Sequence, residues 1–221
     1  MADFAELRER MVERQIAARG IRGAALLAAL RDVPREQFVA PDYARQAYGD
    51  YPLPIEAGQT ISQPYIVALM IEAAAIGPED RVLEVGAGSG YAAAVIGRVT
   101  GTVIAIERLP ELVAGARERI ERLGYHNVTI VEGDGTRGWP NGAPYDAILA
   151  AASGSHVPQP LIDQLAPGGR LVMPVGGRAW AQQLVKLTRL ADGRIERERL
   201  GEVRFVPLIG EEGWSDGGPI D

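Results

Sequence analysis

A glycine-rich turn is the segment of this sequence whose residue types and spacing point most directly to chemistry. Gly86, Gly88 and Gly90 alternate with other residues between two apolar stretches. Glycines at this spacing let the backbone approach a ligand closely, at the strand end where open α/β sheets bind their ligands. Glu84 stands two residues before the turn. We expect the three glycines and Glu84 to form one part of a ligand site.

Two acidic residues after later strands extend this site. Glu107 follows Gly86 by 21 residues and ends the next expected strand, where a carboxylate accepts hydrogen bonds from both hydroxyls of a ribose. Asp134 and Gly135 follow a third expected strand, at a place suited to the edge of an adenine ring. Parallel strands end at the same edge of a sheet, so these residues together predict a nucleoside site. Each acid also has a structural alternative to ligand binding. Glu84 could brace the turn, Glu107 could be a surface acid, and Asp134 could be a turn residue.

The residues after the turn separate the possible nucleoside ligands. A dinucleotide-binding fingerprint has a further glycine where this sequence has Tyr91, and no Lys-Ser or Lys-Thr pair follows to make a phosphate-binding loop. An antiparallel strand is also expected at the end of the sheet. Both features favour an S-adenosylmethionine-dependent methyltransferase over an enzyme that binds NAD.

The periodicity of the sequence predicts the elements that position these residues. Short apolar stretches that read as strands alternate with helical stretches, at 81–85, 102–107, 128–131, 145–150 and 170–175. This alternation is typical of a parallel sheet with helices on both faces. Residues 183–206 read as a hairpin, which adds antiparallel strands at one edge. The expected fold class is α/β, with the mostly parallel, doubly wound sheet of a Rossmann-like class I methyltransferase and an antiparallel edge.

The two ends of the chain are expected to lie outside the methyltransferase domain. Residues 3–19 and a second short stretch ended by Pro34 have helical spacing, and 41–63 reads as a loop with several Pro and Gly residues. A further helix is expected at 66–76. We divide the chain into an N-terminal helical extension with a substrate-side loop (1–62), the S-adenosylmethionine-dependent domain (63–210) and a C-terminal tail (211–221) that frays from Ser215.

Composition excludes several classes of site and partner. The chain has no Cys and only two His among 221 residues, which excludes disulfides, cysteine nucleophiles and cysteine- or histidine-rich metal sites. A formal net charge of −6 argues against a broad nucleic-acid surface. No apolar run reaches the ~18 residues of a membrane span, and the first residues lack a secretory pattern. We expect a monomeric, cytoplasmic protein that binds no metal, nucleic acid or membrane.

Short segments along the chain carry a more specific signal. Gln59-Thr60-Ile61-Ser62-Gln63-Pro64 is the most specific of them. The others are 33–39, 53–55, 82–91, 133–135, 144–148, 165–171, 174–176 and 204–208. In these segments the chain resembles the protein-L-isoaspartate (D-aspartate) O-methyltransferase family, over roughly Met11 to Gly210.

This resemblance implies an activity and assigns residues to it. The family methylates the free α-carboxylate of L-isoaspartyl residues in damaged proteins and peptides with S-adenosylmethionine, and the ester initiates repair through a succinimide. Ser62 corresponds to the family's active-site serine, and Thr60 and Ile61 correspond to the wall of the same site. The resemblance also suggests that the backbone around Val206 pairs with an extended peptide substrate.

Other interpretations remain open at three points. Ser62 has the position of a helix N-cap, with Pro64 in the first turn. The same fold can serve a dedicated peptide or small-molecule carboxylate, or a module that binds the cofactor without catalysis. Finally, Ser153-Gly154-Ser155-His156 stands where the family has an Ala-Pro-containing loop, and we expect it to give a looser and wetter substrate mouth.

Overall fold

A seven-stranded sheet forms the centre of the protein. The computed structural model describes residues 3–178 and 181–216, so most of the stretch predicted to fray, 217–221, lies outside the described residues. The strands are β3 (Arg81–Val85), β4 (Thr102–Glu107), β5 (Val128–Glu132), β6 (Tyr145–Ala150), β7 (Leu165–Val175), β8 (Gln182–Arg189) and β9 (Ile195–Val203). Their order is β5-β4-β3-β6-β7-β8-β9. The pairs from β5 to β7 are parallel and the last two are antiparallel, which confirms the predicted fold class.

Helices cover both faces of the sheet. Alternate residues of the strands point to opposite faces and belong to two hydrophobic clusters. The larger cluster packs the sheet against α3 (Pro64–Ala74), α4 (Tyr91–Gly97) and α5 (Pro110–Arg122), and the smaller packs it against α6 (Gln159–Asp163). Within residues 3–178 and 181–216, no helix combines the length and apolarity needed to cross a membrane.

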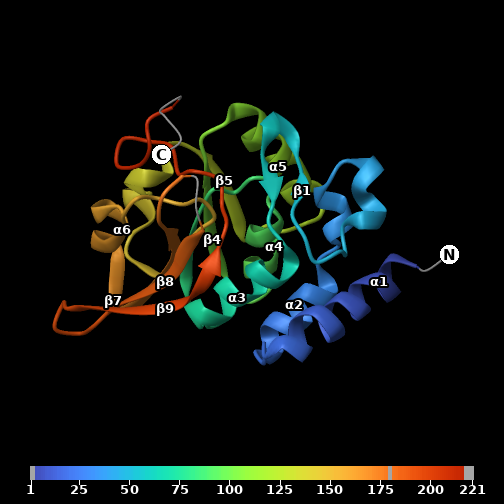
Figure 1. Ribbon diagram of the computed structural model, residues 1–221, viewed down its shortest axis with the longest axis horizontal. Helices are drawn as coiled ribbons and strands as arrows, with labels where there is room; N and C mark the ends of the chain where they lie inside the picture. Colours follow the sequence, from blue (N-terminus) through green and yellow to red (C-terminus); the bar gives the residue numbers. More distant parts are fainter. Residues whose placement is uncertain (1–2, 179–180, 217–221) are drawn as a thin grey trace.

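The N-terminal helices pack into the larger cluster. α1 (Phe4–Met11) continues through a π turn and a 3-10 turn, and α2 (Ala24–Asp32) follows, so both predicted helices are confirmed. Gly20 closes the first helical stretch with a φ of 102°, a left-handed conformation that suits glycine. Met11 and Ile16 are fully buried. In Figure 1 the N-terminal helices lie at one end of the molecule and the β8–β9 hairpin lies at the other.

The segment before α3 contains more structure than the loop predicted there. It holds a 3-10 helix, Pro41–Gln46, and two short strands, β1 (Leu53–Pro54) and β2 (Thr60–Ile61), which pair in antiparallel fashion. Strands of two residues are too short to show an alternating pattern, which is why the sequence did not reveal them. This small sheet fixes the chain immediately before Ser62.

Ser62 does not cap α3, so the predicted N-cap is wrong. The helix begins at Pro64 with Gln63 in the N-cap position, and the Gln63 side chain makes no cap hydrogen bond. Instead, Asp50 Oδ1 accepts a hydrogen bond from the Tyr65 backbone N–H at 3.3 Å, and Asp50 Oδ2 accepts one from Gln63 Nε2 at 2.7 Å. Asp50 thus supplies, from an earlier loop, an acceptor that a helix N-terminus needs.

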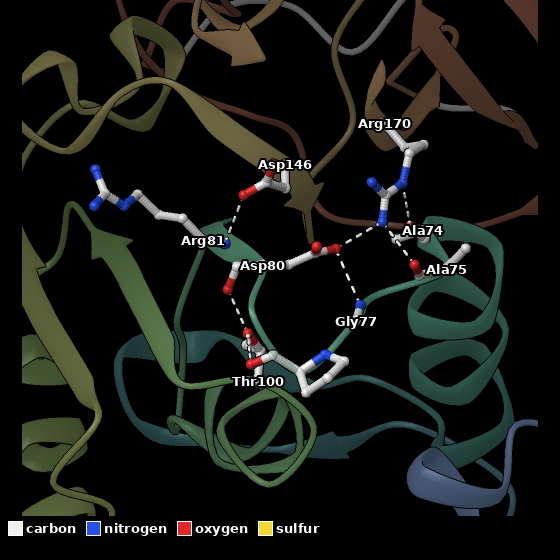
Figure 2. A network of polar contacts seen from close by, with 9 residues as sticks. Ala74, Ala75, Gly77, Asp80, Arg81, Thr100, Asp146 and Arg170 are labelled. Atoms are coloured by element: carbon white, nitrogen blue, oxygen red, sulfur yellow. Dashed lines mark hydrogen bonds and ion pairs between the residues drawn. The ribbon is translucent and has the colours of Figure 1, made fainter. Parts of the chain in front are cut away.

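A polar network at the amino end of β3 holds the other end of α3 (Figure 2). Arg170 of β7 donates from Nε to the Ala74 carbonyl oxygen at 2.7 Å and from Nη2 to the Ala75 carbonyl oxygen at 2.6 Å. The same Nη2 lies 2.7 Å from Asp80 Oδ2, which also accepts a hydrogen bond from the Gly77 backbone N–H at 3.0 Å. Ala75 has a φ of 48°. The helix therefore ends before the predicted residue 76.

Candidate active site

A cavity of about 350 Å³ lies at the carboxyl ends of β3, β4 and β6. This is the edge at which open α/β sheets bind ligands, and the volume is within the range of small-molecule sites. Nine of the eleven residues predicted for the site line the cavity: Thr60, Ile61, Ser62, Glu84, Gly86, Gly88, Glu107, Gly135 and Val206. Gly90 and Asp134 do not. The fold therefore brings the expected cofactor residues and the expected substrate residues to one cavity.

The glycine turn between β3 and α4 forms one wall. Gly88 has a φ of 54°, and a Cβ atom added there would meet only Ile55 Cδ1, at 3.5 Å, so its backbone can face a ligand directly. Gly90 is the N-cap residue of α4 with a φ of 88°. An added Cβ at Gly90 would lie 3.5 Å from side-chain atoms of Ala116 and Ile120 in α5. These are ordinary contact distances, so the left-handed φ, and not a lack of space, favours glycine at position 90.

Glu107 holds the glycine turn in place. It is 6% exposed, so the surface-acid interpretation is wrong. Its Oε2 accepts a hydrogen bond from the Gly88 backbone N–H at 3.0 Å, and its Oε1 accepts from the backbone N–H groups of Arg108 and Leu109 at 2.8 and 3.0 Å. A carboxylate offers about four acceptor positions, so Oε2 has one that none of these backbone N–H groups uses. The contact between Glu107 and the hydroxyls of a ribose stays a prediction.

Glu84, in the same wall, is a buried acid with one unpartnered oxygen. It is 2% exposed, and among the described residues its Oε2 has no hydrogen-bond partner. Burial, together with the negative charge of Glu107, raises the pKa of Glu84 to about 8. An unsatisfied buried oxygen costs about 1–3 kcal/mol, and a ligand that brings a donor or a positive charge removes that cost. This wall therefore fits S-adenosylmethionine, whose sulfonium and amino groups are cationic.

Asp134 lies behind the cavity wall rather than in it. Its Oδ1 accepts hydrogen bonds from the Thr136 backbone N–H and hydroxyl at 2.9 and 2.7 Å, and its Oδ2 accepts one from the Glu211 backbone N–H at 2.8 Å. Burial raises the pKa of Asp134, but these hydrogen bonds outweigh that effect, so the pKa lies below its ordinary value. The next residue, Gly135, does line the cavity. The contact between Asp134 and an adenine edge stays a prediction.

A C-terminal segment, 208–216, closes one side of the cavity, although most of it was predicted as a tail. It contributes the lining residues Leu208, Ile209 and Asp216. Asp216 Oδ2 lies 2.6 Å from Arg108 Nη2, in the turn after β4. Trp214 Nε1 donates to the Ser153 carbonyl oxygen at 2.9 Å. Nothing in the local pattern of 211–216 indicates this role, because its partners lie far away in the sequence.

Ser62 lines the cavity, and its hydroxyl takes part in no helix cap. Its carbonyl oxygen accepts a hydrogen bond from Arg35 Nη2 at 2.7 Å. Val206 also lines the cavity and is 36% exposed. The Val206 carbonyl oxygen already accepts a hydrogen bond from the Ser153 backbone N–H at 2.8 Å. Pairing between this stretch and a peptide stays a prediction.

The loop 153–156 is buried in its first half and exposed in its second: Ser153 and Gly154 are buried, whereas Ser155 and His156 are exposed. A looser and wetter substrate mouth stays a prediction. Ser153 is fully buried, and its backbone bonds to Val206 on one side and Leu208 on the other, each at 2.8 Å. Gly154 forms a bridge to the end of β7. The cavity wall at this place consists of Ala151 and Ala152 instead. Backbone pairing to neighbouring segments therefore holds the first two residues of this loop in place.

Apolar residues that the sequence analysis did not single out form much of the remaining wall. They come from α3 and from the start of α5 and the turn before it: Val67, Met70, Ile71, Leu109 and Leu112. The stretch that forms α3 is apolar on nearly all sides, which predicted burial but not which face meets the cavity. This wall makes the cavity suited to chemistry that must exclude water.

Residues 6–213 match the family described as Protein-L-isoaspartate(D-aspartate) O-methyltransferase (PCMT). The chain is 56% identical over 207 residues to protein-L-isoaspartate O-methyltransferase 2 of Pelobacter propionicus, covering 94% of this chain and 92% of that protein. It is also 56% identical over 210 residues to the protein-L-isoaspartate O-methyltransferase of Methanoregula boonei, covering 95% of each.

Two solved structures share the fold over nearly the whole chain. One, a protein-L-isoaspartate O-methyltransferase, has a TM-score of 0.85 at 31% identity and covers 93% of this chain and 67% of that chain. The other, described as a putative enzyme of the same name from Plasmodium falciparum in complex with S-adenosyl-L-homocysteine, has a TM-score of 0.78 at 28% identity, with 91% and 98% covered. With the sequence match and the cavity in agreement, the chain belongs to the protein-L-isoaspartate(D-aspartate) O-methyltransferase family.

Proposed function

We propose that this protein uses S-adenosylmethionine to esterify the free α-carboxylate of L-isoaspartyl residues in damaged proteins and peptides. One observation carries the proposal: a single cavity brings Ser62, from the segment most specific to the family, together with Glu84 and Glu107. The names of the relatives in Pelobacter propionicus and Methanoregula boonei support the same activity. We place the reaction in the cytoplasm, where a chain without cysteine needs no oxidising compartment.

The residues at the cofactor end of the site bind and orient S-adenosylmethionine. S-adenosylmethionine supplies an electrophilic methyl group on its sulfonium. Glu107 Oε2 accepts a hydrogen bond from a ribose hydroxyl while it holds the Gly88 N–H at 3.0 Å, so ribose binding and the shape of the turn depend on the same carboxylate. Glu84 offers its unpartnered oxygen to a donor or cationic group of the cofactor. Glu107 and Glu84 would hold the cofactor in the same cavity that Ser62 lines.

The substrate end needs no general base. A carboxylate is ionised at pH 7, so no proton has to be removed before it attacks the methyl group. The protein has to hold one carboxylate oxygen in line with the methyl group and keep water out. The Ser62 hydroxyl donates a hydrogen bond to the other oxygen, and the apolar wall from Val67, Met70 and Ile71 excludes water. The absence of histidine from the site is consistent with this chemistry.

The test is methyl transfer to two matched peptides, one with isoaspartate and one with aspartate. Radiolabel from S-adenosylmethionine should enter the isoaspartyl peptide and leave as methanol at alkaline pH. Ser62→Ala should lower turnover more than affinity for S-adenosylhomocysteine, whereas Ser155→Ala, outside the cavity, should change neither. Equal labelling of both peptides contradicts the proposal and favours a different carboxylate substrate. Cofactor binding without any transfer favours a non-catalytic module.

A further inference from the structure

Arg35 is a charged side chain with no exposure to solvent. Arginine is almost never fully buried unless it is paired, because removing its charge from water is costly. Two backbone carbonyl oxygens compensate for part of this cost here, and among the described residues Nη1 has no hydrogen-bond partner. Arg35 Nε donates to Ala47 O at 2.7 Å, and Arg35 Nη2 donates to Ser62 O at 2.7 Å. The guanidinium carbon also lies 4.6 Å from the centroid of the Tyr91 ring, within the range of a cation–π contact.

These contacts join the two sides of the cavity. Ser62 stands between β2 and α3 on the substrate side, and Tyr91 begins α4 directly after the glycine turn on the cofactor side. Both residues line the cavity. Phe38, from the same 3-10 helix as Arg35, packs edge-on against Tyr91 with ring centroids 5.6 Å apart. The guanidinium is thus fixed against the residue that follows the glycine turn while it holds the residue of the substrate loop.

The chain around Ser62 lacks regular structure of its own. Strand β2 ends at Ile61 and α3 begins at Pro64. Asp50 holds Gln63 through its Nε2 and Tyr65 through its backbone N–H, but the hydrogen bond from Arg35 acts on Ser62 itself. A guanidinium presents its donors in a planar, rigid fork. It can therefore fix two carbonyl oxygens in one orientation, which a flexible ammonium group cannot do.

We propose that Arg35 is a positioning residue for methyl transfer, which sets the place of Ser62 relative to the glycine turn because its guanidinium lies over the Tyr91 ring while it holds the Ser62 carbonyl oxygen. The inference rests on the proposed function. A misplacement of about 1 Å at a reacting group can cost about 10²-fold in rate. Loosening Ser62 should therefore slow the methyl-transfer step, while the cofactor contacts of Glu84 and Glu107 remain.

Two variants and one control test this role. Arg35→Lys keeps a positive charge but loses the fork, and Arg35→Met fills the volume without a buried charge but leaves the Ala47 and Ser62 carbonyl oxygens without their donor. The control is Arg170→Met, which removes the guanidinium that holds the Ala74 and Ala75 carbonyl oxygens at the other end of α3 (Figure 2). For each protein we would measure kcat and KM with the isoaspartyl peptide, the Kd for S-adenosylhomocysteine, and Tm.

Both Arg35 variants should lose at least tenfold in kcat, with the Kd for S-adenosylhomocysteine within threefold of the wild-type value. Arg170→Met should lower Tm and leave kcat within twofold. Because Arg35 acts through Ser62, Arg35→Met should have much less effect on kcat in a Ser62→Ala background. Folded Arg35 variants with wild-type kcat overturn the proposal. So do independent effects of Arg35→Met and Ser62→Ala on kcat. Failure of both Arg35 variants to fold also overturns it and would make Arg35 a scaffold residue.

The wild-type assay separates this inference from the function on which it rests. A wild-type protein that labels no isoaspartyl peptide contradicts the proposed function. A wild-type protein that labels the peptide, together with Arg35 variants that match its kcat, contradicts only the role of Arg35.

Discussion

Glu84 should make the stability of the ligand-free protein fall as pH rises toward 9. Burial and the charge of Glu107 raise its pKa from an ordinary 4.5 to about 8 in the folded protein. Between these two values the folded state holds a proton that the unfolded state has released, so the free energy of unfolding decreases with increasing pH. Above pH 8 both states are ionised and the contribution is lost. Glu84→Gln replaces the protonated carboxyl by a neutral amide of similar shape and should remove this dependence.

The size of the effect follows from the position of the pKa. Each unit of pH between the solution and the folded-state pKa corresponds to about 1.36 kcal/mol. At pH 6 the group is two units below its folded-state value of about 8, while the unfolded state is already ionised. Glu84 therefore contributes about 3 kcal/mol to stability at pH 6 that is absent at pH 9. This is a large fraction of the 5–15 kcal/mol by which proteins are stable.

The assay is urea unfolding of cofactor-free protein at several pH values from 6 to 9. The free energy of unfolding of wild type minus that of Glu84→Gln should fall by about 3 kcal/mol over this interval. Glu196→Gln, which removes the same group from the exposed strand β9, should keep the wild-type dependence. Parallel pH dependences for wild type and Glu84→Gln would show that Glu84 is ionised at pH 6 and would refute the reasoning.

Three further predictions concern the binding site and the network in Figure 2. Glu107→Gln should weaken binding of S-adenosylhomocysteine by roughly 1–3 kcal/mol in calorimetry, the scale of a hydrogen bond to a charged group; unchanged affinity contradicts the ribose contact. Asp80→Asn should lower the free energy of unfolding by about 1–2 kcal/mol in urea, because the carboxylate bonds both Arg170 and the Gly77 N–H, and it should leave kcat unaltered; equal stability would exclude a role for the network. A chain that ends at Gly210 should bind S-adenosylhomocysteine several-fold more weakly at similar Tm, because it lacks the cavity wall at Asp216, and wild-type affinity would assign that wall no part in binding.

Elements set by their own residues were predictable from the sequence. Strands β4 and β6 begin and end at the predicted residues, because each is a buried apolar run bounded by residues that break it. The start of α3 was not predictable in the same way. Its acceptor comes from Asp50 in an earlier loop, so the local pattern assigned the cap to the nearest serine, Ser62. A cap supplied by a distant residue leaves no local signal.

The residues of the site also fall into two groups, those that a local sequence pattern predicts and those that depend on distant contacts. The glycine turn and Glu107 were predictable because parallel strands bring their carboxyl ends to one edge, so position in the sequence fixes position in space. Arg35 was not predicted, since an arginine directly after Pro34 reads as a surface residue and its partner Ser62 is 27 residues further along the chain. Its burial depends on the N-terminal helices packing against α4, which no local pattern describes.

Asp134 has two possible roles in the sequence, and contacts with residues far along the chain decide between them. A carboxylate at a strand end can accept hydrogen bonds from an adenine edge or from nearby backbone N–H groups. In this protein Thr136 and Glu211 supply three donors to it, and the chain from Glu211 continues to Asp216 at the cavity. Asp134 therefore acts on the cavity through the C-terminal segment 208–216. Asp134, which follows β5 in the sequence, thus helps to hold the segment 208–216 against the cavity. In the sequence, most of this segment reads as a tail.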